Sequence, residues 1–227
     1  IAPTIGALTA PAKNFGDAAF NLTAPTSNSA GAFTYTSSVP GVATVTSEGT
    51  VTIVGAGSTT ITATQASTTN YTGGSVTASL VVSPIAPTIG ALSAPAKNFG
   101  ASAFDLTAPT SNSTGAFTYT SSVAGVATVT SGGRVTVVGA GSTTITATQA
   151  ASADGNYTGG SVTASLVVSP IAPTIGALSA PAKNFGDASF NLTAPTSNST
   201  GAFTYTSSAE GVATVTSGGT VTVVGAG

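Results

Sequence analysis

The residues of this chain best able to do chemistry are three lysines that recur at one position. Lys13, Lys97 and Lys183 each stand in the run Pro-Ala-Lys-Asn-Phe-Gly. A lysine amine beside a side-chain amide or acid can form an isopeptide cross-link when a buried carboxyl group assists proton transfer. The candidate partners share a second recurring position: Asn21, Asp105 and Asn191.

The acid that such a cross-link needs is not present in every copy. Asp17 follows the first lysine, but Ala101 takes its place after the second. The alternative interpretation is structural, because a solvated lysine keeps the edge of a sheet from pairing with another chain.

Two further places could hold a ligand. Tyr71 and Tyr157 lie in a polar stretch, where an aromatic ring could contact a sugar or pack over the end of a domain. Asp154-Gly155-Asn156 in the same stretch resembles a calcium loop, but Ca²⁺ takes six to eight oxygens and several carboxylates. One acid favours a polar turn, so we expect no metal and no cofactor.

Composition argues against an enzyme. The chain has no His, Cys, Trp or Met, and charged residues make up 4% of its 227 residues. His and Cys are the usual proton shuttle and the most nucleophilic common side chain, so most acid–base, thiol and zinc chemistry is excluded. A net charge of −2, with three Lys and one Arg, leaves no basic patch for nucleic acid. No apolar run is long enough for a transmembrane helix, and no signal peptide is recognisable, so we expect no membrane insertion.

The elements that position these residues belong to a tandem repeat. Ile-Ala-Pro-Thr-Ile-Gly opens residues 1–84, 85–170 and 171–227, which we define as the first, second and third repeats. The second differs from the first mainly by two residues added before Tyr157, in a stretch where a surface loop tolerates insertion. Near-identical copies favour a spacer or a fibre over an enzyme.

Within one repeat, apolar residues alternate with Thr and Ser at period 2, which is typical of strands with one buried face. The alternation is clearest around five pairs: Phe20 and Leu22, Phe33 and Tyr35, Val51 and Ile53, Ile61 and Ala63, Leu80 and Val82. The segments Ile5–Leu8 and Val42–Thr46 are apolar but alternate less cleanly. Turns rich in Gly, Pro and Asn separate these segments, which predicts an all-β sandwich of about seven strands per repeat.

The repeats are joined by short proline-rich linkers that restrict the backbone. These comprise Pro84, Ile85, Ala86 and Pro87, and then Pro170, Ile171, Ala172 and Pro173. The sequence therefore predicts an extended rod of sandwiches. The third repeat lacks counterparts of the last two strands, so we expect it not to fold properly alone. Either the chain continues, which we favour, or strands from a neighbouring chain complete it.

The segment from Gly41 to Thr64 contains Val-Ala-Thr-Val, a Gly turn, Gly-Thr-Val-Thr, a Gly-rich bend and Thr-Ile-Thr-Ala. It resembles bacterial immunoglobulin-like repeats of group 2, as found in intimin- and invasin-like surface adhesins. The same run appears at Gly125–Thr148 and in part at Gly211–Gly227. The resemblance implies an immunoglobulin-like β-sandwich in a secreted or cell-surface protein, and it brings no catalytic residues.

Three functions follow as hypotheses. The first is the stalk of a bacterial adhesin, secreted or on the cell surface. Its partners are then neighbouring repeats of the same chain, and parts outside these residues contact a glycan or receptor. The second is a self-associating subunit of an extracellular fibre or matrix, in which identical chains exchange strands. The third is a carbohydrate-binding module that uses the loop tyrosines.

Overall fold

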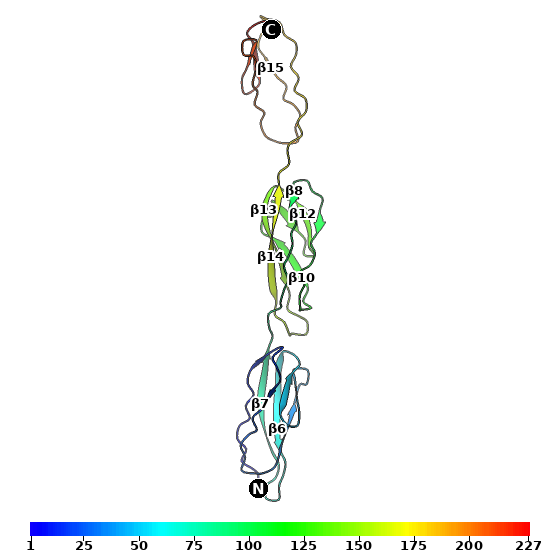
Figure 1. Cartoon of the computed structure of the whole chain (residues 1–227), viewed down its shortest axis with the longest axis vertical. Coiled ribbons are helices and arrows are strands. Elements are labelled where there is room, and N and C mark those ends of the chain that lie inside the picture. The colour runs from blue at the N-terminus through cyan, green and yellow to red at the C-terminus, as the bar shows by residue number, and fades with distance from the viewer. The chain divides into compact units, whose positions relative to one another are not determined.

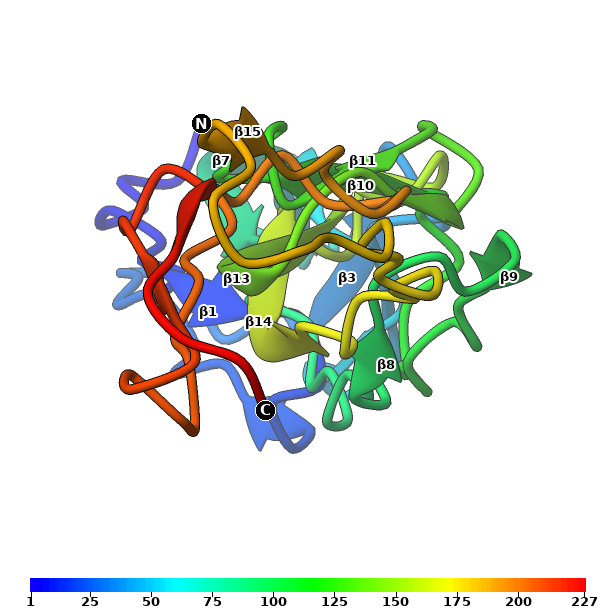
Figure 2. The same ribbon diagram turned by 90° about the horizontal axis from the view of Figure 1, so that it is seen from above.

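The computed structural model describes all 227 residues and builds them from strands and turns. No helix of the chain is long and apolar enough to cross a membrane. Residues 1–170 and 171–227 form two compact units (Figure 1). The ribbon of both units contains strands and loops and no helix (Figures 1 and 2). The all-β prediction is confirmed.

The first repeat contains seven strands in two sheets. They are β1 (Lys13–Asn14), β2 (Phe20–Asn21), β3 (Phe33–Ser37), β4 (Ala43–Val45), β5 (Thr50–Ile53), β6 (Gly57–Gln65) and β7 (Gly74–Ser83). One sheet has the order β1-β7-β6-β3, and the other has the order β2-β5-β4. The two layers enclose one core, as the sandwich prediction requires.

The second repeat reproduces this arrangement. Its strands are β8 (Lys97–Asn98), β9 (Phe104–Asp105), β10 (Phe117–Ser121), β11 (Ala127–Val129), β12 (Arg134–Val137), β13 (Gly141–Gln149) and β14 (Gly160–Ser169). The sheets have the orders β10-β13-β14-β8 and β11-β12-β9, so the topology of the first repeat recurs.

The core of each complete repeat is made by the alternation seen in the sequence. Along β6, Thr59, Ile61, Ala63 and Gln65 are buried, whereas the threonines between them face outward. Ile61 and Leu80 are fully buried, as are Ile145 and Leu166 in the second repeat. Burial of one such side chain stabilises the fold by about 1.5–3 kcal/mol, so these pairs anchor the two sheets to each other.

The longest strands of each complete repeat form one hairpin, β6–β7 in the first repeat and β13–β14 in the second. Its ladder runs from Gly57 opposite Val82 to Gln65 opposite Gly74, and the hairpin β13–β14 has the same register. The loop at its tip spans residues 66–73 in the first repeat and 150–159 in the second. The two added residues therefore fall in this loop and leave the register unchanged.

The N-terminal strand of each complete repeat runs parallel to the last strand. Lys13 and Asn14 pair with Val82 and Ser83, and the N–H of Phe15 donates to Ser83 O at 2.8 Å. The chain therefore enters and leaves each complete repeat along neighbouring strands that point the same way.

The N-terminal segment is less regular than its apolar residues predicted. Ile5 forms only an isolated bridge to Ser27, and the N–H of Gly6 donates to Thr26 O at 2.8 Å. Pro3 and Pro11 lack the N–H that a ladder needs, so a longer strand cannot form there.

The same sequence adopts a different structure in the third repeat. Residues 203–207, identical to the strand Phe33–Ser37, are not a strand, and only β15 (Phe190–Asn191), β16 (Ala213–Val215) and β17 (Thr220–Val223) pair. In the complete repeats this segment pairs with β6 or β13, and residues 171–227 contain no counterpart of that hairpin.

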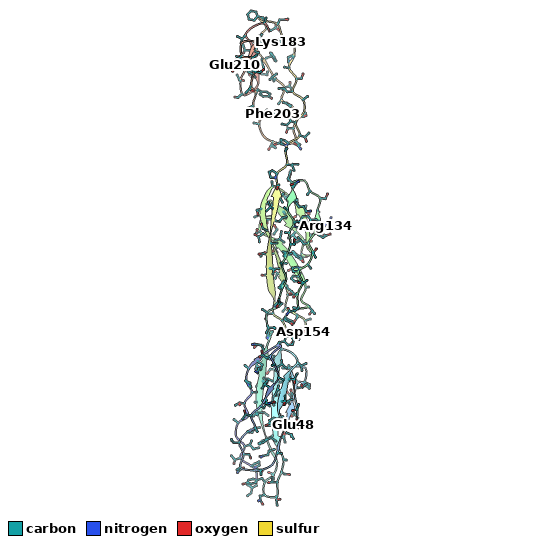
Figure 3. All side chains as sticks on the ribbon, in the orientation of Figure 1. Glu48, Arg134, Asp154, Lys183, Phe203 and Glu210 are labelled. Atoms are coloured by element: carbon teal, nitrogen blue, oxygen red, sulfur yellow. The ribbon has the colours of Figure 1, made fainter.

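The core of the third repeat is open as a result. Leu178 is 51% exposed, compared with 6% for Leu8 at the same position. A hollow of about 370 Å³, lined among others by Phe190, Val221 and Val223, lies where the hairpin packs in the other repeats. Figure 3 shows Phe203 and Lys183 on this unit.

Candidate functional site at the junction of the first two repeats

The loop between β13 and β14 is folded around one carboxylate. Asp154 accepts hydrogen bonds from the Ser152 hydroxyl and from the backbone N–H of Asn156, the second at 3.1 Å. The Ser152 hydroxyl bond, followed by the Asn156 backbone bond, lowers the pKa of the Asp154 carboxyl group. The Tyr157 N–H donates to Ser152 Oγ at 3.0 Å, so this short network fixes the two residues that follow Gly155.

Asn156 reaches from this loop to the first repeat. Its Nδ2 donates to Asp154 Oδ2 at 3.0 Å, which leaves Oδ1 free to accept the Ala56 N–H at 2.7 Å. A Cβ at Gly55 would lie 3.3 Å from Asn156 Oδ1 and 2.7 Å from Gly41 O, so glycine is required for the close approach. Figure 3 shows Asp154 at the end of the second repeat that faces the first.

An aromatic pair lies beside this hydrogen bond. The rings of Phe15 and Tyr157 meet edge to face, with centroids 5.5 Å apart and planes at 78°. Such a pair contributes about 0.5–1.5 kcal/mol beyond the apolar area it buries. The aromatic and polar contacts together hold the Asn-Tyr dipeptide against the end of the first repeat.

The first linker joins the same contact through its backbone. The N–H of Ile85 donates to Asn156 O at 3.1 Å, and Ile85 O accepts the Thr158 N–H at 2.8 Å. Ile85 and Pro87 are half-buried, whereas all of Pro170, Ile171, Ala172 and Pro173 are exposed. The first linker is therefore ordered by the loop of the second repeat as well as by its prolines.

The shorter loop of the first repeat, residues 66–73, makes some of the same hydrogen bonds. The Thr68 N–H donates to Tyr71 O at 2.9 Å, and the Tyr71 N–H donates to Thr68 Oγ1 at 3.3 Å. The Thr72 N–H donates to Ile1 O, as Thr158 does to Ile85. Asn70, however, has no carboxylate comparable to Asp154 beside it. The residues added in the second repeat supply that group.

The three recurring lysines occupy one environment. Lys13 Nζ lies 4.7 Å from the ring centroid of Phe20, and Lys97 and Lys183 lie at 4.6 and 5.2 Å from Phe104 and Phe190. Such cation–π contacts contribute about 0.5–1 kcal/mol at exposed sites. The cross-link remains a prediction of the sequence.

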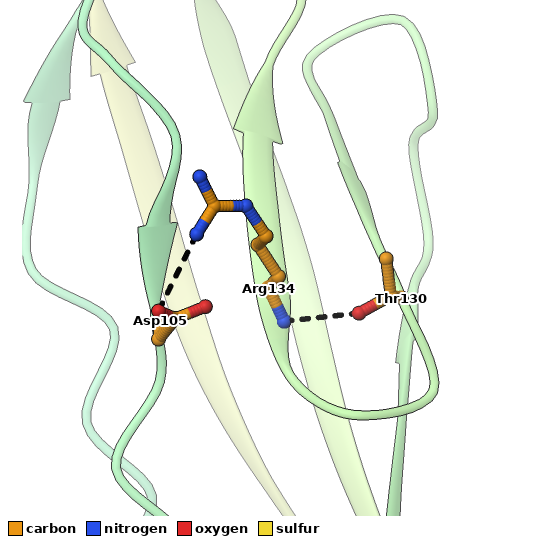
Figure 4. A network of polar contacts seen from close by, with 3 residues as sticks. All are labelled: Asp105, Thr130 and Arg134. Carbon is orange, nitrogen blue, oxygen red and sulfur yellow. Dashed lines mark hydrogen bonds and ion pairs between the residues drawn. The ribbon is translucent and has the colours of Figure 1, made fainter.

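The candidate cross-link partners make other contacts. Asn21 accepts the Thr50 hydroxyl at 2.8 Å, and Asn191 accepts the Thr220 hydroxyl at the same distance. Asp105 Oδ2 lies 3.4 Å from Arg134 Nη1, and the Arg134 N–H donates to Thr130 Oγ1 at 3.1 Å (Figure 4). No three His, Cys, Asp or Glu residues gather at a site that could hold a metal ion.

Sequence reasoning missed the acceptor half of the junction. The sequence predicts only a bend at Gly55 and Ala56 and gives Phe15 no role, yet these residues form the surface on which Asn156 and Tyr157 dock. Phe15 follows Lys-Asn at a position that is Phe in every repeat. A large aromatic residue directly before Gly16, outside the alternating segments, is the available signal, because turns seldom require one.

Comparison with known proteins supports the fold. The family model described as "Intimin, immunoglobulin-like domain" matches residues 22–67 and 108–151, one segment in each complete repeat. No curated protein matches the sequence.

Similar solved structures share a low identity with the chain. Domains 4 and 5 of the S-layer protein SbsC are 20% identical, over 66% of this chain and 81% of that one, with a TM-score of 0.28. Immunoglobulin domains 1–5 of Sidekick-1 are 14% identical, over 78% and 41% of the two chains, with a TM-score of 0.38. A SusE-like surface located polysaccharide binding protein from Bacteroides thetaiotaomicron is 13% identical, over 75% and 34%, with a TM-score of 0.30.

The chain thus spans 34% and 41% of the length of the last two proteins. Scores this low carry no information about function. The expected resemblance rests on the family match and is confirmed by it: the chain carries tandem immunoglobulin-like domains of the kind found in intimin.

Proposed function

We propose that these repeats are a structural spacer, the stalk of a bacterial adhesin that is secreted or held at the cell surface. The observation that carries the proposal is the use of the Asn156–Tyr157 loop. This loop is the part of the second repeat best suited to bind a ligand, and its side chains contact the preceding repeat instead. Repeats that use their polar loops to join one another extend a chain, and binding is left to other parts of the protein.

The chemistry of the surface agrees with a spacer. The outer faces of the hairpins carry Thr and Ser, and the only ion pair of the chain is the exposed one between Arg134 and Asp105. An uncharged hydroxyl surface is hydrated, and it offers no charge complementarity to a specific partner. The adhesive contact, to a glycan or to a protein receptor, is therefore assigned to regions outside these residues.

The test is small-angle X-ray scattering with light scattering on residues 1–170, over a concentration series. A spacer is expected to stay monomeric, with a maximum dimension near that of two sandwiches in line, about 70–80 Å from strand lengths and loops. A compact particle with the two repeats side by side, or growth with concentration, would refute the proposal.

A self-associating fibre subunit is the second candidate, and the low charge of the repeats favours it. Charged residues make up 4% of the chain and the net charge is −2, so little repulsion keeps these β domains apart. The same concentration series separates the two functions, because a fibre subunit is expected to grow into larger particles and a spacer to stay monomeric.

A further inference from the structure

The acceptor surface of the first repeat has an unoccupied copy on the second. Phe99, Gly139 and Ala140 correspond to Phe15, Gly55 and Ala56. Phe99 is 46% exposed, whereas Phe15 is half-buried under Tyr157.

The backbone of this copy is more exposed as well. Gly55 is buried and Ala56 half-buried, but Gly139 is half-buried and Ala140 exposed. The Ala56 N–H donates to Asn156, and the Ala140 N–H has no partner in the protein. A hollow of about 470 Å³ lies beside Phe99, lined also by Lys97, Asn98, Gly100 and Ser169.

We propose that Phe99, Gly139 and Ala140 form a docking site for the Asn-Tyr loop of another complete repeat. The identical surface on the first repeat is occupied by that loop, which identifies the ligand by its chemistry. It is an edge-on phenol ring on Phe99 and a side-chain amide oxygen on the Ala140 N–H. Residues 171–227 contain no counterpart of residues 150–159, so they cannot supply the loop.

The linker explains why a small contact is sufficient. Ser169-Pro170-Ile171-Ala172-Pro173 repeats Ser83-Pro84-Ile85-Ala86-Pro87, so a complete repeat placed after Pro170 is held as the second repeat is held after Pro84. A short linker presents the loop at an effective concentration of roughly millimolar or more. Contacts too weak to join free molecules then become populated within one chain.

The carboxylate of the loop sets how firmly it docks. Asp154 fixes Asn156 by accepting from its Nδ2 and its N–H, which leaves the amide oxygen pointing outward. Loops with Asp-Gly before Asn-Tyr are therefore tight ligands for the surface. The shorter loop around Asn70 has no such carboxylate, so its side-chain amide is less constrained.

The experiment places residues 85–170 a second time after Pro170, which gives a chain of three complete repeats. Each repeat of this three-repeat chain is complete, with the seven strands and the core of the first or second repeat, so its folding does not depend on docking. The readout is amide hydrogen exchange by NMR at Ala56 and at the first copy of Ala140. In the chain of residues 1–170, Ala56 is expected to be protected and Ala140 to exchange like an exposed amide. In the three-repeat protein, exchange at Ala140 is expected to slow at least about tenfold, toward that of Ala56.

The matched control carries Asn156→Ala and Tyr157→Ala in the added copy only. It is expected to return Ala140 to fast exchange, with Ala56 unchanged. If Ala140 exchanges as fast in the three-repeat protein as in residues 1–170 while the added core is protected, the docking site does not exist.

This inference rests on the spacer function, and the two fail in different ways. A monomeric, elongated three-repeat protein with a fast Ala140 amide would refute docking and leave a jointed spacer. Association of the protein into larger particles in scattering would refute the spacer, whatever the exchange at Ala140 shows.

Discussion

Gln65 offers the sharpest test of how the sandwich is held together. Only 1% of its surface is exposed, at the end of β6, where a period-2 pattern places an apolar residue. Its Nε2 donates to Ser29 O and Gly31 O, both at 2.9 Å, and its Oε1 accepts the Ser27 hydroxyl at 2.7 Å. The side chain therefore ties the hairpin to the loop before β3.

The expected cost of Gln65→Leu follows from these three bonds. Each contributes about 0.5–1.5 kcal/mol net, which gives about 1.5–4.5 kcal/mol in total. The three partners are half-buried, so water recovers part of this loss. We expect the free energy of unfolding of the first repeat to fall by about 2–3 kcal/mol, which lowers the urea midpoint by about 2–3 M at a slope near 1 kcal/mol/M.

The assay is urea unfolding of residues 1–170, with native-state hydrogen exchange to separate the two cores. Protection at Ile61 and Ala63 is expected to fall, while Ile145 and Ala147 serve as the unchanged reference. Thr64→Val, on the exposed face beside Gln65, is the control and is expected to stay within about 0.5 kcal/mol of the parent.

Gln65→Glu tests how the stability loss changes with pH when the buried side chain carries a charge. A carboxylate of similar shape would face two carbonyl oxygens without a donor, so it is expected to destabilise more than leucine at neutral pH. The loss should shrink on acidification, because burial disfavours the charged form. If Gln65→Leu costs no more than Thr64→Val, the buried hydrogen bonds do not hold the repeat and the reasoning fails.

Three further changes test the junction and the surface. Phe15→Ala is expected to lower the free energy of unfolding of the first repeat by about 0.5–1.5 kcal/mol more than Phe99→Ala lowers that of the second, since only Phe15 meets Tyr157; equal losses in urea unfolding would argue against the contact. Asp154 has a lowered pKa in the folded protein, chiefly through Ser152, so its support of the loop is present above its unfolded pKa and is lost as the pH falls through its folded pKa. The Ala56 amide shift should titrate over that acidic range, and a shift that also titrates in Asp154→Asn would contradict this. Arg134→Ala is expected to change stability by less than about 0.5 kcal/mol at low and high salt, because both partners of its ion pair are exposed; a larger, salt-dependent loss would overturn that estimate.

The strands and layers of the complete repeats could be predicted because each strand has one buried face. The alternation around Ile61 and Ala63 identifies β6, and Leu80 and Val82 identify β7. Gly and Pro clusters locate the turns between them, so the number of strands follows from the sequence.

The fate of residues 203–207 could not be predicted from local pattern. The segment is identical to β3, yet it forms no ladder because its partner strand is not among residues 171–227. A strand of this length gains its stability from cross-strand pairs, and propensity alone does not supply it. The local sequence therefore allows this segment to be a strand, and the presence of a pairing strand such as β6 decides whether the strand forms.

The junction was predictable only in part. The insertion before Tyr157 pointed to a surface loop, and its aromatic residue suggested a contact. The acceptor could not be identified, because Phe15 and Ala56 are separated in sequence and meet Tyr157 and Asn156 only through the fold of two repeats.

The parallel pairing of β1 with β7 has a mechanical consequence. A pull on the two ends of a complete repeat draws β1 and β7 in opposite directions along their common axis. The backbone hydrogen bonds at Lys13, Asn14 and Phe15 are then loaded together in shear, so they must break together and cannot break one after another. The lifetime of a repeat under tension is set by its rate of unfolding. A chain of such repeats therefore resists force through the short parallel strand pair of each sandwich, β1–β7 or β8–β14.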